Sequence, residues 1–182
     1  MDIFCQIKEK LNSQVIDETE NFYLLHDGYP LLEGHLLLIP KLHVDCYFNL
    51  DTKLLKEFNL FKKKSVSFLK DKYRQPVIFE HGLVGQTVPH AHLHLLPTSK
   101  LITNQLKEYA ETSETPHIPY IYYEYLSSKK YFKPITKITP GLLTILYAKI
   151  LNRPTVNLDR ANSLEKWLYA VKKNYSIWQK KN

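Results

Sequence analysis

Three histidines alternate with apolar residues within GQTVPHAHLHLLP, which spans residues 85–97. They are His90, His92 and His94, and the chain has eight histidines in all. Alternate residues of a β-strand share one face, so this spacing predicts three imidazoles on one side and a core-facing apolar side. Buried imidazoles need polar partners and stabilise a core less than leucines do. The pattern therefore indicates chemistry near neutral pH, where histidine changes its charge.

Two kinds of site are compatible with three converging imidazoles. One is a metal centre, because histidine nitrogens on one strand face can bind zinc. The other uses a neutral imidazole as a nucleophile on phosphorus. The preceding Gly85-Gln86-Thr87 supplies a backbone turn, an amide and a hydroxyl, which suit phosphate oxygens. A closed zinc site needs none of these groups, so the prefix favours nucleophilic catalysis.

The surrounding sequence predicts an α+β fold, mainly an antiparallel sheet with one long helix. Short β-prone runs are expected to form strands at 14–17, 22–25, 35–39, 77–79 and through the histidines to 97. The long helix is expected from Thr52 to about Tyr73, with Asp51 as its N-cap, because apolar residues recur there at helical spacing.

The second half of the chain has a different composition. Residues 1–98 contain 11 Lys and Arg against 12 Asp and Glu, whereas residues 99–182 contain 14 against 6. The second half also holds nine of the thirteen tyrosines, one β-prone run at 118–125 and helical patterns at 142–151 and 164–178. We therefore divide the chain into a domain at 1–98 and a basic, aromatic C-terminal extension at 99–182. Its apolar residues predict that the extension packs on the sheet and shapes the rim of a pocket.

The composition, 44% hydrophobic and 24% charged, is typical of a soluble globular protein. The N-terminal segment lacks the pattern of a secretory signal, and no window approaches the roughly 18 apolar residues that span a membrane. Two cysteines, Cys5 and Cys46, form no disulfide framework. We expect a cytoplasmic protein without a membrane partner. The basic extension leaves nucleic-acid binding open, but a solvated lysine-rich surface is the interpretation we favour.

The histidine segment closely resembles the signature of the histidine triad (HIT) superfamily, His-φ-His-φ-His-φ-φ with φ apolar. The resemblance covers about residues 1–98, because FCQI at 4–7, HDGYP at 26–30 and EGHLLLIPKLHV at 33–44 follow the family's order and spacing. It implies an antiparallel sheet with a long helix. It also implies hydrolysis or transfer of nucleotides at the α-phosphate through a covalent nucleotidyl-histidine intermediate. A purine nucleotide substrate is expected, and a homodimer is one assembly that the resemblance allows.

The resemblance assigns a role to each of four histidines. His92 matches the central nucleophile, and His90 matches the first triad histidine, whose backbone orients it. His94 matches the third, near the phosphate and the leaving group. His35 matches a fourth histidine that supports the triad.

Seven further residues match the family's nucleotide-binding positions. Asp27 falls where members bind the ribose hydroxyls, which suits a carboxylate acceptor. Gln86 and Thr87 match residues that contact the phosphate or bridging oxygen. Ile3, Phe4 and Ile7, together with Leu25, fall where members build an apolar slot for the base, although plain core packing explains these four equally well.

Residues 80–84 depart from the family pattern. Many members have a more polar stretch there that includes an asparagine, and either Glu80 or His81 could take its place. A third alternative, which we favour, is that His81 is simply exposed.

A zinc site known in some members is incomplete in this sequence. Those members bind zinc through a Cys-x-x-Cys pair, the histidine of Pro-Lys-x-His and a triad histidine. The first cysteine position is Asp2 here, whereas Cys5, His43 and His90 remain. A carboxylate with three such ligands could still bind zinc. Because the cysteine pair is lost, we predict a protein without metal or other cofactor.

Three functions remain as hypotheses. The first is an enzyme that releases a nucleoside monophosphate from dinucleoside polyphosphates or nucleotide phosphoramidates. The second is a deadenylase acting on adenylated nucleic-acid ends, for which the basic extension would be a docking surface. The third is a nucleotide-binding module that has lost catalysis. The intact triad argues against the third, and the lack of a Cys or His pair after residue 99 argues against the second.

Overall fold

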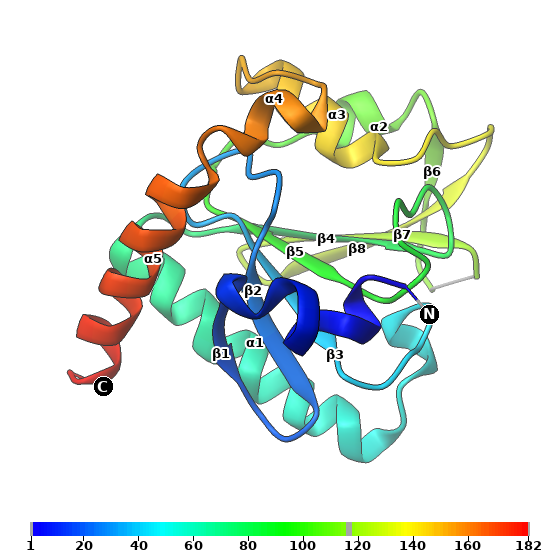
Figure 1. Cartoon of the computed structure of the whole chain (residues 1–182). Coiled ribbons are helices and arrows are strands. Elements are labelled where there is room, and N and C mark those ends of the chain that lie inside the picture. The colour runs from blue at the N-terminus through cyan, green and yellow to red at the C-terminus, as the bar shows by residue number, and fades with distance from the viewer. Residues whose placement is uncertain (1, 116–117, 182) are drawn as a thin grey trace.

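Eight strands form one antiparallel sheet in the order β1-β2-β3-β5-β4-β7-β8-β6 (Figure 1). The computed structural model describes residues 2–115 and 118–181, except the side chains of 157 and 158. The strands are β1 (Val15–Glu18), β2 (Phe22–His26), β3 (Leu36–Pro40), β4 (Val77–Gly82), β5 (Leu93–Leu96), β6 (Ala110–Ser113), β7 (Tyr120–Tyr125) and β8 (Ser128–Pro134). The α-helices are α1 (Thr52–Lys72), α2 (Thr103–Leu106), α3 (Leu142–Ile150), α4 (Asn157–Ala161) and α5 (Leu164–Gln179). Short helical turns lie at Phe4–Gln6, Ile7–Leu11, Asn12–Gln14 and Tyr47–Asn49.

The predicted α+β architecture is confirmed, including the long helix α1, and strands β1 and β2 pair as an antiparallel hairpin. The carboxylate of Asp51 accepts a hydrogen bond from Leu54 N at 2.8 Å, so it caps α1 as expected. Among the described residues, no helix is long and apolar enough to cross a lipid bilayer.

Side-chain alternation along the strands divides the core between the two faces of the sheet. One face packs against α1 and α5; the strand residues in this core are Leu24, Leu36, Leu38, Ile78, Leu93 and Leu95. The opposite face is covered in two places. The N-terminal turns lie over Tyr23, Leu25, Leu37 and Ile39, and α2 and α3 lie over Val77, Phe79, Leu96 and Phe132. Figure 1 shows α1 on one side of the sheet and α2, α3 and α4 on the other.

The prediction of a single strand carrying all three histidines is wrong. Strand β5 begins only at Leu93, so His94 is in the sheet while His90 and His92 precede it. Pro89 has no N–H to donate to a neighbouring strand, and Ala91 N bonds to the carbonyl of Val44 at 2.7 Å instead. Ala91, Leu93 and Leu95 still face the α1 core as predicted.

The C-terminal extension packs on the sheet, as predicted from its apolar residues. Strand β7 pairs with β4 from Ile78↔Glu124 to Gly82↔Tyr120, so one sheet continues across the boundary at residue 98. Helix α5 lies against α1, where the Trp178 and Phe68 rings are 5.7 Å apart. The hairpin partner β8 and the edge strand β6 were not predicted, because their residues lack an apolar run.

Candidate active site

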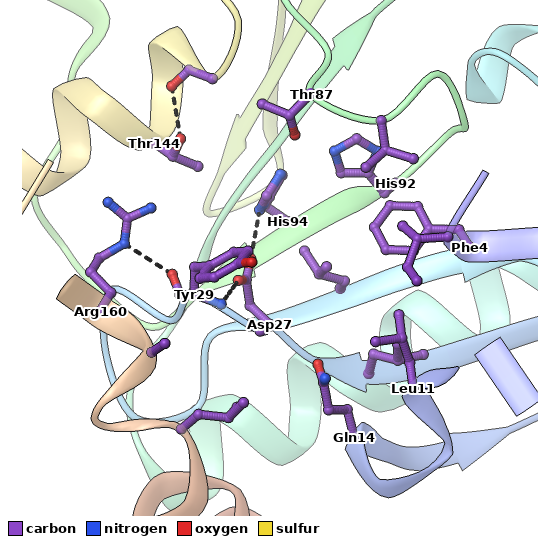
Figure 2. A pocket seen from close by; sticks show the side chains of 18 of the residues that line it. Phe4, Leu11, Gln14, Asp27, Tyr29, Thr87, His92, His94, Thr144 and Arg160 are labelled. Atoms are coloured by element: carbon purple, nitrogen blue, oxygen red, sulfur yellow. Dashed lines mark hydrogen bonds and ion pairs between the residues drawn. The ribbon is translucent and has the colours of Figure 1, made fainter. Parts of the chain in front are cut away.

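A cavity of about 670 Å³ lies between the N-terminal turns and the extension (Figure 2). One wall comes from the first half of the chain, with Ile3, Phe4, Leu11, Gln14, Leu25 and Leu37. The opposite wall comes from the extension, with Gly141, Thr144, Arg160, Ala161 and Leu164. The rings of His92 and His94 lie between these walls. The prediction that the extension shapes the pocket is therefore confirmed.

The ring of His92 is held in one orientation by the backbone before it. Its Nδ1 lies 2.6 Å from the carbonyl oxygen of His90, so Nδ1 carries the proton and donates it. Nε2 therefore keeps its lone pair, and it has no hydrogen-bond partner within the described part of the chain. Burial lowers the pKa of His92 below its usual value, although the His90 carbonyl and the charge of Asp27 act against this shift. A neutral imidazole with an available nitrogen thus lines the cavity.

A chain of hydrogen bonds fixes the proton on His94. Leu31 N donates to Nδ1 of His35 at 3.3 Å, so the proton of His35 is on Nε2. That Nε2 lies 3.1 Å from Nδ1 of His94, which must accept. The proton of His94 is consequently on its Nε2, where it can be donated. Burial lowers the pKa of His35 to about 4 and that of His94 well below its usual value, so both rings are neutral at pH 7.

The carboxylate of Asp27 lines the cavity beside this relay. Its Oδ1 accepts a hydrogen bond from Tyr29 N at 2.7 Å. Its Oδ2 lies 3.7 Å from His35 Nε2 and 3.7 Å from His94 Nδ1. The dashed lines of Figure 2 join Asp27 to Tyr29 and His94. The side chain is placed to accept hydrogen bonds from a ligand.

The apolar positions assigned to a base slot separate into two groups. Ile3, Phe4 and Leu25 line the cavity, and the Phe4 ring lies 5.3 Å from that of His92. Ile7 is almost fully buried in the cluster behind them and does not line the cavity. Sequence pattern did not identify Leu11 and the residues that α3 and α4 bring to the opposite wall.

Of the two residues assigned to phosphate contacts, Gln86 and Thr87, only Thr87 lines the cavity. Thr87 is exposed and lines the cavity. The amide of Gln86 instead donates a hydrogen bond to the carbonyl of Asp45 at 2.7 Å and is not among the lining residues. In this arrangement Gln86 holds the turn before the histidines, and Thr87 is the side chain that meets the cavity.

The expectation that His81 is exposed is wrong. Its side chain is 2% exposed and lines the cavity, whereas Glu80 points to the opposite face of the sheet. There Glu80 accepts hydrogen bonds from Tyr47 N at 2.9 Å and from the Tyr120 hydroxyl at 2.7 Å. Burial raises the pKa of Glu80 to about 7. Alternation along β4 could have indicated this, because His81 must share a face with Phe79, which stacks on His94.

Asp2, Cys5, His43 and His90 form a second cluster outside the cavity. Each offers one potential ligand atom, and these atoms all lie within 4.8 Å of one another. Nε2 of His90 donates to the carbonyl of Pro40 at 2.9 Å, which leaves Nδ1 facing the cluster. One thiol, two imidazoles and one carboxylate match the donors and the number that a structural zinc ion takes. The four residues could hold a metal ion, but Asp2 replaces a soft thiolate by a carboxylate, which weakens the fit to zinc.

The zinc content of the purified protein is a direct prediction. From the missing cysteine alone we expect less than about 0.1 zinc per chain, since thiolates bind zinc more tightly than carboxylates. Elemental analysis of protein purified without added metal measures this ratio. One zinc per chain, lost on Asp2→Ala substitution, would contradict the expectation and assign the metal to the four converging residues.

Comparison with known proteins identifies the family. The model of the HIT domain matches residues 8–101, just over half of the chain. The chain belongs to the HIT family. An uncharacterised HIT-like protein of Mycoplasma pneumoniae is 33% identical over 100 residues, which cover 52% of this chain and 69% of that protein. An adenosine 5'-monophosphoramidase of Saccharomyces cerevisiae is 34% identical over 98 residues, which cover 52% of this chain and 61% of that protein.

Comparison with solved structures finds a chain of similar fold. A hypothetical protein from Leishmania major superposes with a TM-score of 0.50 at 26% sequence identity. The match covers 59% of this chain and 89% of that protein. The matched regions in sequence end near the start of the extension, so the wall that α3 and α4 add to the cavity lies outside the HIT domain.

Proposed function

We propose that this HIT protein hydrolyses or transfers nucleotides at the α-phosphate through a covalent intermediate on His92. The observation that carries the proposal is the fixed tautomer of His92, whose Nδ1 proton is donated to the His90 carbonyl. This leaves Nε2 neutral and available in the cavity at pH 7.

His94 supplies an N–H that stabilises the leaving group. In the first step His92 Nε2 attacks phosphorus and the bond to the leaving group breaks; the leaving atom departs with the electron pair, accepts a hydrogen bond from His94 Nε2–H and takes a proton from solvent. Water or another acceptor then attacks phosphorus, the bond between phosphorus and His92 Nε2 breaks, the acceptor gives its proton to solvent, and His92 returns to its neutral form. Because His35 donates to His94 Nδ1 at 3.1 Å, the ring keeps the orientation that both steps require.

A purine nucleotide is the substrate that we propose, with the base in the slot beside Phe4 and the ribose hydroxyls on Asp27. The yeast relative named adenosine 5'-monophosphoramidase supports adenosine as the nucleoside and a phosphoramidate as one substrate class. Dinucleoside polyphosphates are a second class, in which a phosphoanhydride bond at the α-phosphate is broken instead of a phosphorus–nitrogen bond.

Release of AMP tests the proposal. The purified protein is incubated with adenosine 5'-phosphoramidate, a diadenosine polyphosphate and a 5'-adenylated oligonucleotide, and AMP is measured by chromatography. We expect turnover of at least one of the two small conjugates. Turnover of the oligonucleotide alone would favour the deadenylase, and AMP binding without any turnover would favour a module that has lost catalysis.

A further inference from the structure

His81 lies at the end of a row of rings that crosses the cavity. The ring centroids are 5.3 Å apart for Phe4 and His92, 5.1 Å for His92 and His94, and 6.4 Å for His94 and His81. The base slot is at the Phe4 end of this row. His81 lines the same cavity and contacts the His94 ring, which lies between it and His92 in this series. We infer that His81 faces the part of the substrate beyond the α-phosphate, which includes the leaving group.

The hydrogen bonds of His81 fix its tautomer. Leu143 N, in the first turn of α3, donates to His81 Nε2 at 3.3 Å, so the proton is on Nδ1. Nδ1 has no hydrogen-bond partner among residues 2–115 and 118–181. Burial lowers the pKa of His81 to about 3, so the ring stays neutral at physiological pH. The 2% exposed ring therefore keeps one N–H that donates to no partner in the part of the chain that the structure describes.

The N-terminus of α3 lies beside this donor. Gly141 caps the helix in the left-handed region, with φ of 73°, and its N–H donates to the Gly85 carbonyl at 2.8 Å. Gly85 makes this approach achievable, because a Cβ atom there would lie 2.6 Å from Ile138 Cγ2. The nine-residue helix thus directs its positive end toward the turn that carries Thr87, and that end attracts anions. In Figure 2, Thr144 and Arg160 lie on one side of His94 and Phe4 on the other.

We propose that His81 is a substrate-binding residue whose Nδ1–H donates to an oxygen of the leaving group, and that it selects leaving groups that carry phosphate. The inference rests on the proposed function and extends it, because it concerns the part of the substrate beyond the α-phosphate. A neutral donor beside a helix N-terminus favours an anionic, oxygen-rich group over an amine.

Two substitutions separate the two nitrogens of His81. His81→Gln places an amide oxygen near the position of Nε2, so it can still accept from Leu143 N, but it offers no donor at Nδ1. His81→Asn places an amide nitrogen near the position of Nδ1, so it keeps the donor and loses the acceptor. A purely structural role predicts that His81→Asn is the damaged variant. Our proposal predicts that it is His81→Gln.

The experiment compares kcat/KM for a diadenosine polyphosphate and for adenosine 5'-phosphoramidate in the full-length chain. For His81→Gln we expect a loss of about 100-fold on the polyphosphate, typical of one donor to a developing charge, and less than about threefold on the phosphoramidate. For His81→Asn we expect both substrates to stay within about fivefold of the unsubstituted protein. Equal losses on both substrates, or a larger loss for His81→Asn, would overturn the proposal. If the unsubstituted protein turns over neither substrate, the proposed function fails instead.

The protonation of His81 can also be measured in the unsubstituted protein, which does not depend on the folding of a variant. Nitrogen-15 NMR of the histidine rings, assigned with His81→Gln or by through-bond correlation, reports which ring nitrogen is protonated. We expect the Nδ1–H tautomer for His81, with a shift of that signal when inorganic pyrophosphate is added with AMP. The Nε2–H tautomer, or no shift at saturating pyrophosphate, would overturn the proposal.

Discussion

Substituting His92→Asn is expected to lower turnover by about 10³-fold or more while the fold and AMP binding persist. The asparagine amide can replace Nδ1 as the donor to the His90 carbonyl, which His92 contacts at 2.6 Å. What the variant lacks is Nε2, the nitrogen that forms the bond to phosphorus. The loss should therefore appear in kcat with the best substrate found, while the dissociation constant for AMP and the melting temperature change little.

A matched control and a pH profile complete this test. His43→Asn makes the same substitution at a half-exposed histidine outside the cavity and should retain full turnover in the metal-free protein. In the unsubstituted protein, burial lowers the pKa of His92, so the reactive neutral form persists below pH 6.5, where an exposed histidine becomes protonated. kcat/KM should accordingly stay level to below pH 6.5 before it falls. Near-normal turnover in His92→Asn would show that the covalent mechanism is wrong.

Removal of the extension after Pro97 or Thr98 is expected to unfold or aggregate the remaining domain. The cut takes β7 from the edge of β4 and takes α5 from the α1 core, which contains Val171, Tyr175 and Trp178. It also uncovers Phe79, whose ring stacks at 5.4 Å on Tyr147 of α3. Each large apolar side chain returned to water costs about 1.5–3 kcal/mol, and several together approach the total stability of a domain.

The fragment should show no cooperative melting transition and should bind a dye for exposed apolar surface. A chain shortened only by α5, ending at Ser163, provides an intermediate case that retains β7 and α3. Tyr169→Ala serves as the control for α5 itself, because that side chain is 72% exposed and should not alter the melting temperature. A monomeric, well-folded and fully active fragment of residues 1–98 would contradict this prediction.

Local patterns were sufficient to predict most strands of the sheet and the importance of the histidines at 90–94, of which His92 and His94 line the cavity. Asp51 and the spacing of apolar residues located α1, because capping and helical periodicity act within a few residues. The position at which β5 begins, after His92, was not predictable in this way. Ala91 bonds to Val44, which is 47 positions earlier, and pairing over such distances leaves no mark in the local sequence.

The extension was expected to shape the rim of the cavity, but the residues that form this second wall escaped prediction for the same reason. Arg160 has the appearance of an ordinary solvated charge in the sequence, yet it is 2% exposed and donates to the Tyr29 carbonyl at 3.0 Å. His81 was misplaced because the strand containing it was expected to end at 79, whereas β4 continues to Gly82. Once that strand length is known, side-chain alternation places His81 in the cavity without further information.

The HIT domain and the extension each form one wall of the cavity. A ligand that contacts both walls therefore stabilises the packing of the extension on the HIT domain. Arg160 joins Tyr29, the neighbour of Asp27 in the cavity, to the carbonyls of Pro154 and Thr155 ahead of α4. A nucleotide that touches both walls binds only when they are assembled, so by mass action it opposes their separation. At a hundred times its dissociation constant it would add about 2.7 kcal/mol to the cost of detaching α3 and α4. A bound nucleotide would therefore stabilise the contact between the extension and the HIT domain, and this stabilisation would be lost when the nucleotide dissociates.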